Sequence, residues 1–92
     1  LSREGKMRSL CLYRALKEAE NLIKKGERDV SFIEEKMRET VEKGYKSRID
    51  YLKVLDAGNL KELKQVRGRI VIAGAVFVEG VRLIDNIVLS VD

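Results

Sequence analysis

Two long apolar runs separated by two turn residues constrain the fold of this 92-residue chain more than any other feature. Residues 69–78 contain hardly a polar side chain, and residues 81–91 form a second run rich in Val, Ile and Leu. The link between them is Glu79-Gly80, and glycine reaches the positive φ that a two-residue β-hairpin loop requires. We therefore predict an antiparallel hairpin in which the residues that flank this loop face one another.

Counting outward from the loop assigns each hairpin residue to one of two faces of the predicted sheet. The first face carries Val78, Val76, Gly74, Ile72 and Ile70, opposite Val81, Leu83, Asp85, Ile87 and Leu89. The second carries Phe77, Ala75, Ala73 and Val71, opposite Arg82, Ile84, Asn86 and Val88. Neither is the polar face that an antiparallel sheet ordinarily turns to water. Helices can cover one face, so we expect something else to shield part of the other.

An arginine and an Asp-Asn pair interrupt the second apolar run, and they are the candidate site residues: Arg82, Asp85 and Asn86. A polar group inside a sheet lowers stability unless it is partnered, so the pattern indicates a polar contact or a domain interface. One interpretation makes Asp85 a structural carboxylate that accepts backbone or Arg/Lys hydrogen bonds, and Arg82 a rim charge packed on Phe77. The alternative is that the hairpin end contacts an anionic ligand or another domain.

The N-terminal residues have the periodicity of an amphipathic helix. We predict that this helix starts at Ser2 as its N-cap and ends near Lys25, before Gly26. Its apolar stripe consists of Leu12, Leu16, Ala19 and Ile23. The single cysteine, Cys11, belongs to the same stripe and is predicted to be a core thiol.

A second helix is predicted to start at a capping box formed by Ser31 and Glu34 and to end at Gly44. Its apolar stripe consists of Ile33, Met37 and Val41. The short connection between the two helices predicts an antiparallel helix hairpin.

Beyond Gly44 the pattern becomes that of strands, and residues 48–55 are predicted to form one. Residues 56–59 have turn chemistry, and residues 59–63 are expected to form one helical turn. The predicted fold class is α+β, in which an N-terminal antiparallel helix hairpin packs on a three-stranded, mainly antiparallel sheet. Residues 1–92 are expected to form a single domain.

Composition excludes several classes of function. The chain has no histidine, which excludes Ser-His and Cys-His catalysis and nearly all zinc sites. Its single cysteine excludes an internal disulfide and is typical of a reducing compartment, so we expect a cytoplasmic protein. No apolar run reaches the roughly 18–20 residues of a membrane span. The net charge of +4 is only weak evidence for an anionic partner, so nucleic-acid binding is not favoured.

Several strings, in their order and spacing, resemble the C-terminal part of the pantothenate synthetase (pantoate–β-alanine ligase) family. In the sheet half they are Ile49-Asp50-Tyr51-Leu52, Asp56, Leu60, Leu63, the glycine turn and Arg82-Leu83-Ile84-Asp85-Asn86. In the helical half they are Leu1-Ser2, Leu12-Tyr13-Arg14-Ala15-Leu16 and Gly26-Glu27-Arg28. The resemblance covers essentially the whole chain.

The resemblance implies an enzyme that uses ATP, with magnesium, to convert pantoate to an acyl adenylate, which β-alanine then attacks with release of AMP. In the family a histidine-bearing motif and a Ser-Ser-Arg-Asn-type loop of a Rossmann-like N-terminal domain bind the nucleotide. This chain contains neither motif. We therefore assign it no catalytic residues, no metal site and no bound cofactor. The resemblance implies that it is the lid domain, inactive alone, whose partner is the N-terminal catalytic domain that carries pantoate, β-alanine and ATP.

Two alternatives stay open at this point. The chain could be a small nucleic-acid-binding module, for which salt-dependent binding would be diagnostic, although its sheet offers few aromatic side chains for stacking. It could instead be an oligomerisation module that self-associates through its uncovered sheet face or its strand edges.

Overall fold

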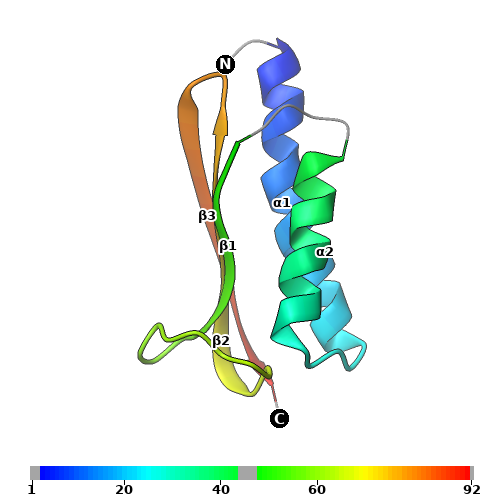
Figure 1. The fold of residues 1–92 in the computed structure, drawn as a ribbon, viewed down its shortest axis with the longest axis vertical. Helices are drawn as coiled ribbons and strands as arrows, with labels where there is room; N and C mark the ends of the chain where they lie inside the picture. The colour runs from blue at the N-terminus through cyan, green and yellow to red at the C-terminus, as the bar shows by residue number, and fades with distance from the viewer. Residues whose placement is uncertain (1–2, 44–47, 92) are drawn as a thin grey trace.

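A computed structural model of the chain describes residues 3–43 and 48–91, and the side chains in these ranges except those of residues 4–9. The elements in chain order are α1 (Arg3–Lys24), α2 (Val30–Glu42), β1 (Arg48–Asp56), β2 (Gly68–Val78) and β3 (Val81–Val91). The strands form one antiparallel sheet in the order β1-β2-β3. Figure 1 shows α1 and α2 side by side as an antiparallel pair, layered on one face of this sheet. The predicted α+β fold is confirmed.

Both helices turn their predicted apolar stripes toward the sheet. The buried helix residues are Cys11, Leu12, Ala15, Leu16, Ala19, Ile23, Val30, Ile33, Met37 and Val41. Gly26, at φ +108°, follows the end of α1 as predicted. The predicted N-cap Ser2 and the predicted stop at Gly44 lie outside the described residues. Within the described ranges, no helix is long and apolar enough to cross a membrane.

The predicted capping box of the second helix is wrong. The N-cap of α2 is Asp29, whose side chain accepts a hydrogen bond from the Phe32 N–H at 3.3 Å. The earlier start puts Val30 on the buried stripe of α2, where it is 4% exposed. Glu34 does not reach back to the helix terminus, because its Oε2 accepts a hydrogen bond from the Val54 N–H of β1 at 3.0 Å.

The hairpin of β2 and β3 has the predicted turn and the predicted register. Val78 pairs with Val81, and the pairing continues without a shift to Gly68 and Val91. Both turn residues have positive φ, +53° at Glu79 and +78° at Gly80. This is the type I′ geometry whose twist matches that of the two strands.

A β-bulge in β1 was not predicted. The pairing of β1 with β2 shifts between Ile49 and Tyr51, so Asp50 is the extra residue. Because of this shift, Leu52 and Val54 point to the helices, where they are 2% and 0% exposed, while Tyr51 pairs opposite Ala75. The bulge thus adds Asp50 to the strand without displacing the core residues that follow it.

The helical turn expected at residues 59–63 is also wrong. Oδ1 of Asp56 accepts hydrogen bonds from the N–H groups of Gly58 and Asn59, at 2.8 and 3.1 Å. Leu60 then takes a left-handed conformation with φ +59°. This reversal lets the segment return along β1, so that the Asp56 N–H donates to the Lys61 carbonyl at 2.9 Å. The turn chemistry of Asp56 therefore prevails over local helix propensity.

Carboxylates occupy outward N–H groups on both edges of the sheet. On β1, the Val54 N–H is bound by Glu34 as described above. On β3, Oδ1 of Asp85 accepts a hydrogen bond from the N–H of Asn86 at 2.8 Å. An edge N–H that already has an acceptor is less available to a strand of another chain. These contacts therefore act against edge-to-edge association.

We expect Gly74→Ala to destabilise the fold. A Cβ at this position would lie 2.6 Å from Leu12 Cδ1 and 2.9 Å from Leu52 Cδ2, both on nearly fully buried side chains. Overpacking of this kind costs about 1–3 kcal/mol in the free energy of unfolding. Urea titration measures the effect, with the exposed β3 substitution Ser90→Ala as control. Equal stability of the two variants would show that the layers can separate without cost.

Glu34→Ala removes the acceptor of the Val54 N–H and is expected to lower the free energy of unfolding by about 1 kcal/mol. The matched control is Glu35→Ala, a truncation of the exposed neighbouring carboxylate on the same helix. Thermal and urea unfolding of the two variants should separate them. If Glu35→Ala costs as much, the effect comes from the helix and not from the contact with β1.

Candidate functional site

The three candidate residues lie along one strand but do not form a cluster. Arg82 pairs opposite Phe77 and Asn86 opposite Ala73, on the face of the sheet turned away from the helices. Asp85, opposite Gly74, belongs to the alternate face. All three are exposed. The structure therefore separates Asp85 from the other two candidates.

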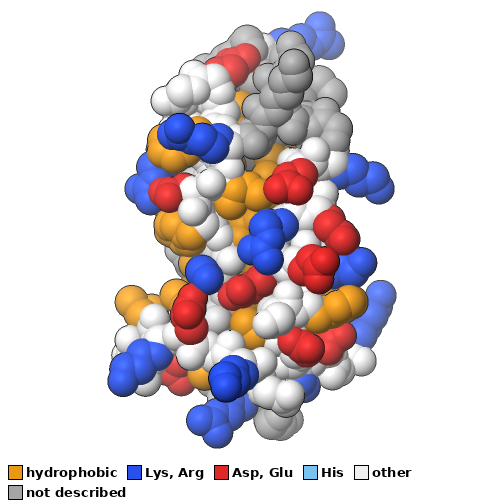
Figure 2. All heavy atoms as spheres, in the orientation of Figure 1, with side chains coloured by type: hydrophobic (Ala, Val, Ile, Leu, Met, Phe, Trp, Pro, Cys, Tyr) orange, Lys and Arg blue, Asp and Glu red, His pale blue; other side chains and the backbone are white. Residues whose placement is uncertain are grey.

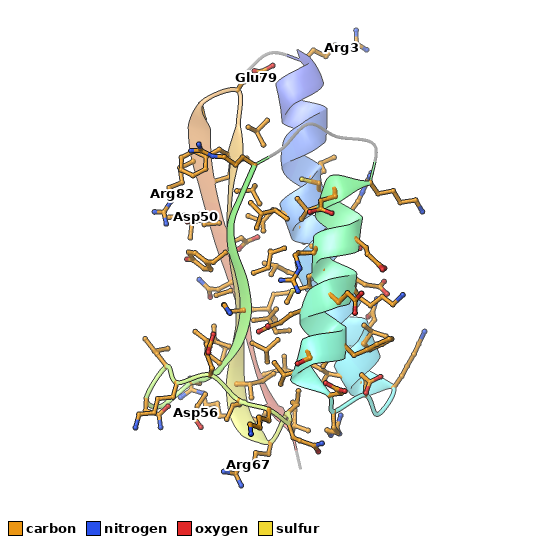
Figure 3. The ribbon with its side chains drawn as sticks, viewed as in Figure 1. Arg3, Asp50, Asp56, Arg67, Glu79 and Arg82 are labelled. Carbon is orange, nitrogen blue, oxygen red and sulfur yellow. The ribbon has the colours of Figure 1, made fainter. Side chains whose placement is uncertain are left out.

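Arg82 is held by an ion pair across the sheet. Its Nε and Nη2 donate to Oδ2 of Asp50 at 3.1 and 2.8 Å, and the two side chains are 44% and 40% exposed. Figure 3 shows both residues on the side of the sheet opposite the helices. The β1 bulge supplies the partner. Asp50 is the extra residue of the bulge, next to Tyr51, and the register shift puts it on the same face of the sheet as Arg82. One sequence signal could have indicated the bulge. Ile49 is three residues from Leu52, whereas residues on one face of a regular strand are an even number of residues apart.

An arginine also covers the aromatic ring at this end of the sheet, but it is Arg48 rather than Arg82. The guanidinium carbon of Arg48 lies 4.3 Å from the centroid of the Phe77 ring. This cation–π contact and the Arg82–Asp50 pair fix two cationic groups at the hairpin end of the same face. Their planar donor groups remain partly open to an anionic group.

Asp85 has the backbone hydrogen bond that the structural interpretation predicted. Its Oδ1 accepts from the Asn86 N–H at 2.8 Å, and its side chain is exposed at the edge of β3. The Asn86 side chain is exposed on the other face. This geometry supports a role for Asp85 at the strand edge.

Two short ion pairs at the surface shift the pKa values of their members. The hydrogen bond from Lys53 at 2.7 Å lowers the pKa of the Glu62 carboxyl, and the same bond raises the pKa of Lys53. Lys17 and Glu20 behave in the same way, since their 2.7 Å hydrogen bond lowers the Glu20 pKa and raises the Lys17 pKa. Both carboxylates stay charged to lower pH than usual, so their contribution to stability is lost on acidification through the lowered pKa.

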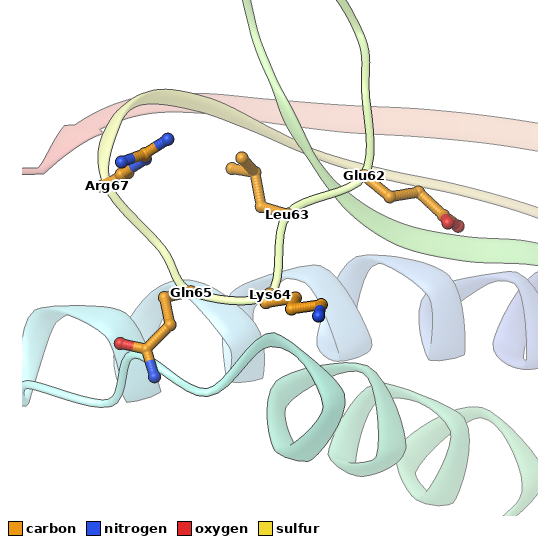
Figure 4. Close-up of a pocket in the computed structure, with 5 residues that line it drawn as sticks. All are labelled: Glu62, Leu63, Lys64, Gln65 and Arg67. Carbon is orange, nitrogen blue, oxygen red and sulfur yellow. The ribbon is translucent and has the colours of Figure 1, made fainter.

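Two hollows in the described part of the surface do not join groups that could perform catalysis. The larger, of about 360 Å³, is lined by Glu62, Leu63, Lys64, Gln65 and Arg67 of the β1–β2 connection. Figure 4 shows that these side chains point in different directions. The smaller hollow, of about 190 Å³, lies between the end of α1 and β3. In the part of the chain that the structure describes, no three Cys, Asp or Glu side chains are grouped to hold a metal ion.

The main candidate surface is therefore the open sheet face, defined as the side chains of β1, β2 and β3 that point away from the helices. Its exposed apolar members include Ile84 at 58% and Val88 at 47%. Its centre, Ala75, is fully buried between its strand neighbours Tyr51 and Ile84. Figure 2 shows a different surface over the helical layer, where basic and acidic side chains are interspersed.

The comparisons with known proteins point to one family. Residues 1–88 match the family model described as pantoate-beta-alanine ligase. Pantothenate synthetase of Syntrophomonas wolfei is 43% identical over 91 residues, and that of Moorella thermoacetica 40% over 92. These matches cover 99% and 100% of this chain but 32% of each relative.

The likeness extends to three dimensions. A crystal structure of pantothenate synthetase from Thermus thermophilus matches with a TM-score of 0.79 and 30% identity. The match covers 95% of this chain and 31% of that one. The chain therefore spans about a third of the length of the proteins that it matches.

A double-mutant cycle of Arg82→Ala and Asp50→Ala should measure a favourable coupling of about 0.2–1 kcal/mol in the free energy of unfolding, the range of exposed ion pairs. The coupling should shrink as salt is added, because the pair is accessible to ions. Arg69→Ala combined with Asp50→Ala is the control, since Arg69 lies at the opposite end of the same face. Additive effects of Arg82 and Asp50 would show that the pair is not formed in solution.

Proposed function

The chain belongs to the pantoate–beta-alanine ligase family, and from this membership we propose that it is the C-terminal lid domain of a pantothenate synthetase. The observation that carries the proposal is the pattern of coverage. Relatives at about 40% identity match this chain from end to end, while it matches only about a third of each of them.

The reaction proposed for the complete enzyme is the ATP-dependent condensation of pantoate with β-alanine. Pantoate is first converted to pantoyl adenylate with release of diphosphate, and β-alanine then forms the amide with release of AMP. We place ATP, its magnesium ion and both substrates on the N-terminal catalytic domain. The histidine-bearing motif and the Ser-Ser-Arg-Asn-type loop that bind the nucleotide in the family are not in this chain, which favours this division.

The physical role proposed for the domain is to cover the reacting centre. An acyl adenylate reacts with water, so a cover that excludes water while the amine attacks increases the yield of amide. A layered domain of two helices on a sheet can move as a rigid body, because its core is fully buried and continuous. We expect this role in the cytoplasm, where the single thiol Cys11 remains reduced.

The candidate residues keep an interdomain or ligand-facing role in this proposal. Arg82 and Asn86 lie on the open sheet face, where a second domain can contact them. Asp85 is placed at the strand edge, so its contribution would be to the edge contact. None of the three is proposed to take part in the chemical steps.

A chimera tests the proposed function. This chain replaces the matched third of the Syntrophomonas wolfei enzyme, and pantothenate formation and AMP release are measured with ATP, pantoate and β-alanine. We expect activity in the chimera, and none in the 92-residue chain alone or in the relative without its matched third. Ligation by the 92-residue chain alone would refute the lid role, and a folded but inactive chimera would refute the function.

A further inference from the structure

We propose that the open sheet face is the surface through which this domain docks on the rest of the enzyme, and that the complementary surface is apolar with acidic groups around it. This inference rests on the proposed function, since it requires a second domain in the same chain. It predicts which kind of surface that domain presents to this one: apolar at its centre and acidic around it.

The first observation is the asymmetry between the two faces of the sheet. On the helix side, Ile70, Ile72, Val76 and Val78 of the central strand are 0% exposed. On the open side, the apolar residues include Tyr51, Leu55, Val71, Phe77, Ile84 and Val88. Ile84 and Val88 lie on this face of β3 and are about half exposed. Asn86 and Lys53 lie between these residues on the outer strands, while Val71, Ala73, Ala75 and Phe77 form an unbroken apolar row on β2. Exposed apolar groups gathered on one face are typical of an interaction site.

The second observation is the charge around this surface. Counted over the described strand residues that face this side, Arg48, Arg69 and Arg82 oppose the one carboxylate Asp50. Lys53 is already paired with Glu62. Arg48 and Arg82 lie at the hairpin end and Arg69 at the other, so cationic groups flank the apolar centre at both ends.

This charge pattern selects the occupant. In a pair of copies joined face to face, the arginines of one would oppose those of the other, which disfavours association. A surface with acidic groups around an apolar centre would instead pair with the three arginines and exclude water from Ile84 and Val88. The proposed function supplies a second domain within the same polypeptide to carry this surface, since the relatives are about three times as long as this chain.

The hairpin end of the face is fixed before docking. The Arg48 guanidinium lies over the Phe77 ring, and Arg82 donates twice to Asp50. Side chains held in this way lose less conformational freedom when a partner binds. The same arginines have donors left over for a carboxylate of the partner.

Covalent side-chain footprinting tests the docking surface independently of catalysis. The probe is carbene labelling of the chimera and of the 92-residue chain, read by mass spectrometry, with circular dichroism to establish that both are folded. We expect labelling of Ile84 and Val88 to fall several-fold in the chimera. Leu10 and Tyr13 on α1, at 47% and 53% exposure, are the matched controls and should be labelled equally in both. Equal labelling of Ile84 and Val88, or protection of Leu10 and Tyr13 in their place, would overturn the proposal.

Substitutions on the open sheet face and on α1 provide a second test of the docking surface. Phe77, on the same face, should also be protected in the chimera. Ile84→Glu with Val88→Glu should restore its labelling, whereas Leu10→Glu with Tyr13→Glu should not. Arg69→Glu should weaken the protection, and Arg14→Glu on α1 should leave it unchanged. If Arg69→Glu strengthened the protection, the acidic partner surface would be wrong.

The outcomes separate the docking surface from the function. An inactive chimera that still protects Ile84 and Val88 would refute the proposed function but support the docking surface. An active chimera without this protection would support the function and refute the docking surface. Sedimentation of the 92-residue chain should show a monomer. A stable dimer that Ile84→Glu with Val88→Glu separates, and Leu10→Glu with Tyr13→Glu does not, would overturn the choice of occupant.

Discussion

The contact between Leu12 of α1 and the bare backbone of Gly74 in β2 sets the distance between the two layers of this molecule. A Cβ at Gly74 would be 2.6 Å from Leu12 Cδ1, so the helix lies as close to the sheet as a residue without a side chain permits. Leu52 of β1 approaches the same point from the neighbouring strand. Side chains of α1 and β1 therefore leave no room for a side chain at Gly74.

The helical layer covers only one of the two faces of the sheet (Figure 1). Two helices are enough to cover one face of a three-stranded sheet, and they leave the other face without a layer. The open face nonetheless has an apolar row along β2, and Ile84 and Val88 of β3 are exposed beside it. None of the described elements α1, α2 and β1–β3 covers this face, and the docking proposal places another domain there.

Polar groups are placed mainly where they protect or terminate the layered structure. Glu34 joins α2 to the edge of β1, and Asp85 binds an N–H on the edge of β3. Asp56 closes the turn that carries the chain away from β1. The Arg82–Asp50 pair differs from these, since it crosses the exposed side of the sheet between its two outer strands. It is thus the polar feature least required by the core and best placed for a partner.

The sequence by itself determined the elements whose signals are local. Helical periodicity specified both buried stripes, and the Glu79-Gly80 turn specified the whole register of β2 and β3, because each pairing follows from the one before it. The family was also recognisable from ordered strings such as Arg82 to Asn86. The start of α2, by contrast, was predicted wrongly at Ser31, because the structure has Asp29 as the N-cap and Val30 buried in the first turn.

Only the tertiary structure decided which distant groups meet. The partner of Arg82 is 32 residues away, and it reaches the open face only because a bulge in β1 shifts the register there. The exchange of Arg48 for Arg82 over the Phe77 ring, and the return of residues 60–62 along β1, depend likewise on how the strands lie side by side. Such contacts follow from core packing summed over many residues, whereas sequence patterns report on neighbours within a turn of helix or along one strand.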